Sequence, residues 1–156
     1  MKRLLLTLAA CLIASTVYAT DLTVTAANVK ATSTSAKIVR VKFGEAVTQG
    51  QAVYRKEADG EYYKADADAG TNEVAAVAGV AITPGSTDEY GYIITEGPMN
   101  IGATLTVGEI YVLSGTAGGV CPEADLANPD KVTIIGVATS SSILSVLPFA
   151  STAVVP

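Results

Sequence analysis

The sequence predicts an all-β fold, either a small closed β-barrel or a compact sandwich, preceded by an apolar N-terminal segment. Short stretches rich in Val, Ile, Thr and Tyr recur along the chain, and Gly, Pro, Asn or Asp separate them about every eight to twelve residues. Past Thr20, no window of about twelve residues has the apolar spacing of a helix. Of the 156 residues, 49% are hydrophobic and 16% are charged, which suits one folded domain.

The first part of the body predicts strands by alternation and by one hairpin signal. Apolar and polar side chains alternate in two stretches, which a polar turn at 30–37 separates. Asp59-Gly60 predicts a type I′ turn, which requires positive φ at both of its central residues. A polar loop follows at 65–73. We expect strands at 22–26, 38–43, 52–55 and 61–64.

The second part of the body predicts five more strands. Pro84-Gly85 and Gly97-Pro98 end the first two of them, because proline cannot donate to a strand ladder. The Gly-rich residues 115–119 predict a turn, followed by an irregular stretch up to Asp130. We expect strands at 74–82, 90–95, 109–114, 131–138 and 143–147.

One sequence phrase occurs twice, at an offset of 58 residues. Residues 44–54 read GEAVTQGQAVY and residues 102–112 read GATLTVGEIYV, and a GVA triplet follows each phrase. β proteins reuse glycine turns, so coincidence is the competing explanation. The fixed order of the identities favours a duplicated turn-and-strand unit, which suits a sheet that curls on itself and hides its edges. The expected turn residues are Gly44, Gly50, Gly60, Gly102, Gly108 and Gly118.

The N-terminal residues have the parts of a secretion signal. Lys2 and Arg3 precede an apolar run, and Val17-Tyr18-Ala19 is a small-x-small cleavage site. The same segment is interpreted alternatively as an N-terminal arm that stays on the protein. The predicted organisation is a leader or arm at 1–19, an extended segment at 20–36, the β-barrel domain at 37–147 and a loose C-terminal tail at 148–156.

Charge and composition argue against several classes of function. The net charge is −5, whereas nucleic acids and anionic membranes require a basic surface on the protein that binds them. The chain has no His, and its two cysteines are Cys11 and Cys121, so the usual zinc sets and Ser-His or Cys-His pairs are missing. We therefore expect no enzyme activity, no cofactor, no metal, no nucleic acid and no small-molecule substrate.

The tyrosines and the chain ends are the candidates for a protein interface. Tyr is favoured at interfaces, although some tyrosines must pack inward in a chain with two Phe and no Trp. The N-terminal extension and the tail are proposed to contact a partner because neither is expected to fold alone. The candidate interface residues are Leu22, Val24, Val29, Tyr62, Tyr63, Tyr90, Tyr92 and Phe149.

Six short segments resemble the capsid decoration (cement) proteins encoded by tailed phages. They are DLTVTAANV at 21–29, GQAVY at 50–54, AGVA at 78–81, GEIYVLS at 108–114, GGVCP at 118–122 and IGVA at 135–138. The resemblance covers residues 20–148, and the leader departs from it. It implies a non-enzymatic β-barrel on the virion surface, often a homo-trimer, which binds the major capsid protein and clamps neighbouring subunits. The alternative is a secreted or periplasmic β-module, such as an adhesin or filament subunit.

Overall fold

The computed structural model describes residues 20–127 and 129–155, and this part of the chain forms ten strands. A four-residue helix, α1 (Asn72–Ala75), and two 3-10 turns, η1 (Ala26–Asn28) and η2 (Glu123–Asp125), are its helical elements. The strands of the first half are β1 (Lys30–Ala31), β2 (Lys37–Lys42), β3 (Ala52–Arg55), β4 (Tyr62–Lys64), β5 (Val77–Ala81) and β6 (Tyr90–Asn100). The remaining strands are β7 (Ile110–Leu113), β8 (Val120–Pro122), β9 (Lys131–Ala138) and β10 (Ile143–Val154).

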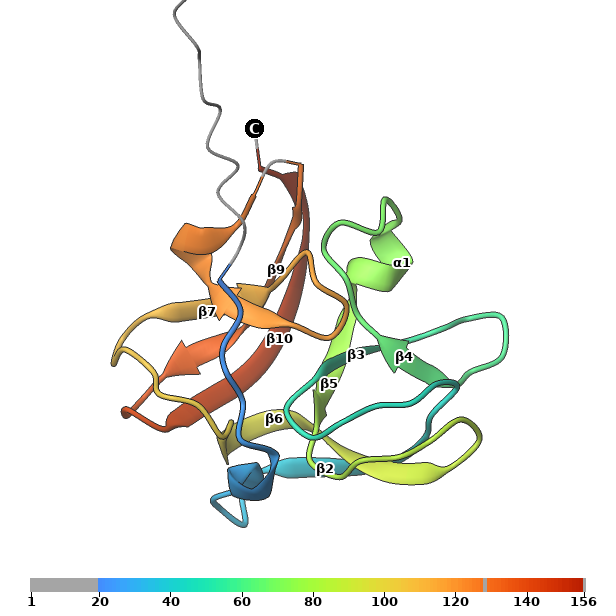
Figure 1. The fold of residues 1–156 in the computed structure, drawn as a ribbon, viewed down its shortest axis with the longest axis horizontal. Helices are drawn as coiled ribbons and strands as arrows, with labels where there is room; N and C mark the ends of the chain where they lie inside the picture. Colours follow the sequence, from blue (N-terminus) through green and yellow to red (C-terminus); the bar gives the residue numbers. More distant parts are fainter. Residues whose placement is uncertain (1–19, 128, 156) are drawn as a thin grey trace, which may run out of the picture.

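The strands form one antiparallel sheet that curls into a half-barrel (Figure 1). Its order is β4-β3-β5-β6-β10-β9-β7-β8, and β1 and β2 also pair with β6. Main-chain hydrogen bonds between loops bridge the two ends of the sheet. Gly118 N–H donates to the Ala65 carbonyl at 2.6 Å, and Ala67 N–H donates to the Ser114 carbonyl at 3.0 Å. The all-β class predicted from the sequence is confirmed.

The two halves of the sheet repeat one another. Read from either end, the order is a two-stranded outer hairpin (β4 and β3, or β8 and β7), then β5 or β9, then β6 or β10. Even the irregularities match: the register of β3 against β5 shifts between Val53 and Tyr54, and that of β7 against β9 shifts between Tyr111 and Val112. These four residues occupy equivalent places at the offset of 58 residues.

The repeated phrase forms the entry into β3 and β7. Gly50 N–H donates to the Ala81 carbonyl and Gly108 N–H to the Ala138 carbonyl, both at 2.8 Å. The two glycines have φ of +87° and +84°, a left-handed conformation that favours glycine. Five of the six predicted turn glycines have a left-handed φ. They are Gly50, Gly60, Gly102, Gly108 and Gly118.

The glycine of each GVA triplet lies where two strands touch closely. A Cβ at Gly79 would lie 2.5 Å from the Ile94 carbonyl oxygen, and one at Gly136 would lie 2.2 Å from that of Ser145. No side chain fits at such distances unless the backbone moves. The triplet therefore marks a packing requirement that both halves share.

The core consists mainly of small and branched side chains, with a few larger ones among them, in two clusters. The main cluster lies between the halves and includes Tyr111, Leu113, Ile135, Leu144 and Met99. The second cluster fills the first half and is built around Phe43, which is fully buried. It consists of Val41, Phe43, Val47, Val53, Ala81 and Ile93.

Several predicted boundaries are wrong, and the reasons are physical. Residues 22–26 form no strand, because they make isolated backbone bonds and no continuous ladder: Leu22 N–H donates to the carbonyl of Val120 in β8, and Thr25 N–H to the carbonyl of Gly102 in a loop. Gly97-Pro98 does not end a strand, since β6 continues through it with Gly97 at φ +105°. Asp59 lacks the positive φ that a type I′ turn requires, although Gly60 has it.

The predicted loose tail is also wrong. Strand β10 continues through Pro148 to Val154 and stays paired with β9, with Phe149 opposite Ile134 and Val154 opposite Lys131. Two short strands, β1 and β8, lie where the sequence suggests only polar or irregular chain. The predicted strand 74–82 begins instead with the last residues of α1, whose first turn is capped by Thr71.

Candidate functional site

Exposed side chains of the types that are enriched at protein interfaces lie across β2 and β6. Arg40 pairs with Tyr92 and Lys42 with Tyr90 in the antiparallel register, so these side chains share one face with Ile38. Tyr90 is 59% exposed, Tyr92 45% and Ile38 46%. We call Ile38, Arg40, Tyr90 and Tyr92 the tyrosine face.

Within the tyrosine face, the Arg40 side chain is held in place by an aromatic ring. Its guanidinium carbon lies 4.1 Å from the ring centroid of Tyr90, which is cation–π geometry. Tyr and Arg are the residues that contribute most at protein interfaces, and an ordered side chain loses less entropy on binding. The tyrosine face therefore offers a preorganised contact surface.

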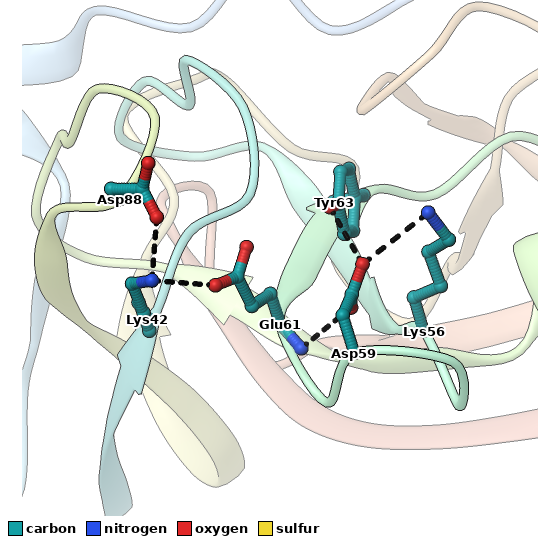
Figure 2. Close-up of polar contacts among 6 residues, drawn as sticks. All are labelled: Lys42, Lys56, Asp59, Glu61, Tyr63 and Asp88. Atoms are coloured by element: carbon teal, nitrogen blue, oxygen red, sulfur yellow. Dashed lines mark hydrogen bonds and ion pairs between the residues drawn. The ribbon is translucent and has the colours of Figure 1, made fainter.

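Next to the tyrosine face, Lys42 lies opposite Tyr90 in the register of β2 and β6. With Glu61 and Asp88 it forms a charged cluster that we call the Lys42 clasp (Figure 2). The Lys42 ammonium donates to Glu61 Oε1 at 2.6 Å and to Asp88 Oδ1 at 2.5 Å. These bonds, that to Asp88 first, raise the pKa of Lys42 above its ordinary range. Because its three members come from the end of β2, the β3–β4 connection and the loop before β6, the clasp ties these segments together.

Asp59 organises the neighbouring β3–β4 turn (Figure 2). It accepts hydrogen bonds from the Glu61 N–H at 3.0 Å and the Tyr63 hydroxyl at 2.9 Å, and the Lys56 ammonium lies 3.3 Å away. The Glu61 N–H is the main cause that lowers the pKa of Asp59, and the bond to Asp59 raises the pKa of Tyr63. Asp59 and Lys56 are paired within this cluster, so the cluster stabilises the β3–β4 turn.

The Tyr63 ring explains one of the repeated glycines. A Cβ at Gly44 would lie 2.1 Å from the ring, so any other residue there would have to displace the Tyr63 side chain. Unlike the other predicted turn glycines, Gly44 does not have a left-handed φ. Its place in the repeated phrase therefore has a different physical basis in the first half.

The single cysteine of the described chain is buried. Burial raises the pKa of the Cys121 thiol to about 12, so the thiol is protonated at neutral pH and a poor nucleophile. Within residues 20–127 and 129–155, no group of three or more His, Cys, Asp or Glu side chains is placed to hold a metal ion.

A second surface of interest is apolar and lies on the outer face of β9 and β10. Leu147 is 64% exposed and Phe149 65% exposed, and they border a groove of about 510 Å³. We call this the β10 groove; its lining is Ile134, Gly136, Val137, Ser145, Leu147, Pro148 and Phe149.

The structure separates the predicted interface residues into three groups. Tyr90, Tyr92 and Phe149 are exposed, the first two on the tyrosine face and the third at the β10 groove. Val29 is buried at 4% exposure and Leu22 and Val24 pack on the main core, so these three do not form a free interface. Tyr62 and Tyr63 are half-buried, one against the Phe43 cluster and one against the main core.

Sequence reasoning missed three surface residues: Ile38, Arg40 and Leu147. The alternation of side chains in these strands is the signal that could have identified Ile38 and Leu147, because it places them on a defined face of their strand. It does not show which of the two faces the rest of the protein covers. Arg40 required the register between β2 and β6, which brings it beside the tyrosines.

A comparison with protein-family models found none that matches this chain, and a comparison with curated proteins found no match. None of the helices in the described ranges has the length and apolar character needed to cross a membrane.

Proposed function

We propose that this protein is a non-enzymatic structural protein of a phage virion, which decorates the outer capsid surface and bridges neighbouring subunits of the major capsid protein. The observation that carries the proposal is the tyrosine face, an ordered Arg-Tyr surface on a rigid sheet. The resemblance of residues 20–148 to capsid decoration proteins supplies the partner.

Strand β6, which bears the two tyrosines of the tyrosine face, is held on both sides, which suits a capsid-binding surface. Residues of β6 are paired on one edge with β2 and on the other with β5, and the Lys42 clasp fixes the end of β2. A rigid surface binds with little ordering cost, and many copies on one shell gain affinity through multivalency.

The second candidate is a secreted or periplasmic β-module, such as an adhesin or filament subunit. The signal-like residues 1–19 favour it. N-terminal sequencing of the mature chain separates the candidates: a start at Thr20 indicates export, and a start at Met1 or Lys2 indicates retention.

The test of the proposal is binding to capsids of a phage whose genome encodes this chain. The variant Arg40→Ser/Tyr90→Ser removes the cation–π pair from the surface without touching the core, and we expect binding to weaken by at least tenfold. Val107→Ser is the matched control, because Val107 is a single apolar side chain, 63% exposed, outside both surfaces. Equal binding of the double variant and the wild type would refute the tyrosine face as the contact.

A further inference from the structure

Strand β2 has a free edge. Among the described strands it pairs with β6 alone, and it lies along the lower border of Figure 1. From Ile38 to Lys42 its register against β6 is regular. The outer edge is engaged at its end, where Phe43 makes an isolated bridge with Tyr62. An unpaired strand edge is a ready template for another extended segment.

The main-chain groups of Ile38 and Arg40 point to this free edge. At one end of the strand the Phe43 N–H donates to the Glu89 carbonyl at 2.9 Å, and at the other end the Lys37 carbonyl accepts a bond from a β6 hydroxyl. Both ends therefore direct main-chain groups toward β6, and the residues between them alternate, as in any antiparallel pair. The N–H and C=O groups of Ile38 and Arg40 consequently face away from β6.

The exposed side chains of β2 lie on both of its faces. Ile38 is 46% exposed and Val39 is 42% exposed, and successive side chains of a strand point to opposite faces. Natural edge strands are commonly protected by proline or by charged side chains. Residues 37–42 contain no proline, and Lys37 and Lys42 are both paired with carboxylates of this chain. The edge between these two lysines is therefore open for pairing.

The segment that contains β2 is basic, whereas the rest of the body is acidic. Residues 22–44 hold four Lys or Arg side chains and no Asp or Glu, while residues 20–156 as a whole hold eight basic and fifteen acidic side chains. Arg40 makes no ion pair within the described residues, and its guanidinium lies over the Tyr90 ring at the surface. Charge complementarity thus favours an acidic partner at this edge and disfavours a basic one.

We infer that the free edge of β2 binds an extended, acidic segment of a partner protein, which adds to the sheet as a strand. The main-chain groups of Ile38 and Arg40 supply the ladder, and a carboxylate of the added strand pairs with the Arg40 guanidinium. This inference goes beyond the proposed function, because it states how the partner is bound and what chemistry its segment has, whether or not that partner is a capsid protein.

A second β2 strand does not fit this edge. Two-fold pairing centred on Arg40 places the two Arg40 guanidinium groups opposite each other, which destabilises a strand pair. No other register offers Arg40 a carboxylate from the second strand, because β2 contains no Asp or Glu. The occupant that satisfies both the main chain and the charge is therefore an acidic segment of another protein.

Binding of synthetic peptides to the full chain tests this inference, with fluorescence anisotropy as the measurement. The first probe is a short labelled peptide that alternates Glu and Val, and the second has Lys in place of every Glu. We expect the acidic peptide to bind about tenfold more tightly or better, and salt to weaken its binding. A fully N-methylated acidic peptide keeps the charges but cannot form a strand ladder, so we expect it to bind about tenfold more weakly.

A matched pair of variants places the contact on β2. Ile38→Pro removes the outward N–H, which an edge strand tolerates, whereas Ile38→Thr removes the same apolar side chain and keeps that N–H. We expect the proline variant to bind the acidic peptide about tenfold more weakly than the threonine variant. Circular dichroism and the melting temperature check that both are folded. If Ile38→Pro fails to fold, Arg40→Gln replaces it and is expected to remove most of the preference for the acidic peptide.

Several results would overturn the inference. They are equal affinity for the acidic and basic peptides, no binding of the acidic peptide, and binding that N-methylation leaves unchanged. Equal binding by the Ile38→Pro and Ile38→Thr variants would do so as well, as would self-association through β2 in analytical ultracentrifugation. Because the probes contain no capsid protein, each of these results is independent of whether the chain binds capsids.

Discussion

The two halves of the molecule share a plan but differ in what they leave exposed. Both contain two matching turn glycines with left-handed φ, Gly50 and Gly60 in the first half and Gly108 and Gly118 in the second, together with the same register shift and the same close approach at the GVA glycine. The first half adds β2 beside β6 and exposes Arg40 of β2 opposite Tyr92 of β6. The second half has no such added strand and leaves Leu147 and Phe149 exposed. The features that both halves share therefore stabilise the fold, whereas the candidate interfaces lie where the two halves differ.

The largest expected effect comes from the glycines that both halves require. Gly79→Ala and Gly136→Ala each force a methyl group against a backbone carbonyl, and we expect each to lower the free energy of unfolding by about 3 kcal/mol or to prevent folding. Urea denaturation measures this. A loss below about 0.5 kcal/mol in either half would show that the two sites are not equivalent.

Smaller losses of stability are expected at the glycines of the repeated phrase, where alanine substitutions distinguish the cost of a left-handed φ from the cost of a steric clash. A Cβ at Gly108 meets nothing within 4 Å, so Gly108→Ala reports the left-handed φ alone, about 1 kcal/mol. A Cβ at Gly50 would lie 2.6 Å from a methyl group of Val24, so Gly50→Ala should cost more. Adding Val24→Ala to Gly50→Ala should recover part of that excess, whereas no recovery would contradict the packing explanation.

A buried hydrogen bond joins the halves and provides an intermediate test. The Thr133 hydroxyl, fully buried on β9, donates to the Ala75 carbonyl at the end of α1 at 2.7 Å. Thr133→Val keeps the shape but leaves that carbonyl without this donor, so we expect a loss of about 1–2 kcal/mol in thermal or urea unfolding. Thr139→Val, at an exposed hydroxyl of the β9–β10 turn, is the control and should change little.

The sequence predicts those features of the structure that depend on neighbouring residues, and it fails where a feature depends on residues far along the chain. The repeated glycines were informative because a left-handed φ or a close backbone approach needs glycine whatever the rest of the chain does. Residues 22–26 alternate like a strand, yet their backbone N–H groups donate to the carbonyls of Val120 and Gly102, far along the chain, which no local pattern reveals. The prolines at 148 and 156 suggested a loose tail, but Pro148 lies in a strand where the ladder is already shifted.

The candidate surfaces also depend on contacts between residues far apart in the sequence, which local patterns do not reveal. Residue type predicts Tyr90 and Tyr92 as interface residues, whereas its place in the N-terminal extension predicts Val29, which the fold buries. Exposure depends on the register of β2 and β6 and on the curl of the sheet, which are long-range properties. Arg40 became a candidate once its position over the Tyr90 ring was known.

The smallest expected effect concerns pH and belongs to the first half alone. The pKa of Asp59 is lowered in the folded state, chiefly by the Glu61 N–H, so its contribution to stability is present above the unfolded value of about 3.9. That contribution is lost as the pH falls through the lower folded value. Asp59→Asn should flatten this part of the pH dependence of unfolding, and an unchanged acid slope would contradict the assignment.

The proposed role of this chain is that of a structural component of a phage particle. The most direct measurement is quantitative mass spectrometry of purified virions of a phage that encodes it, with the major capsid protein as the internal reference. We predict that the chain is present in many copies per capsid and stays bound through purification. Its absence from particles, together with its abundance in the periplasm or the medium, would contradict the claim and favour a secreted module.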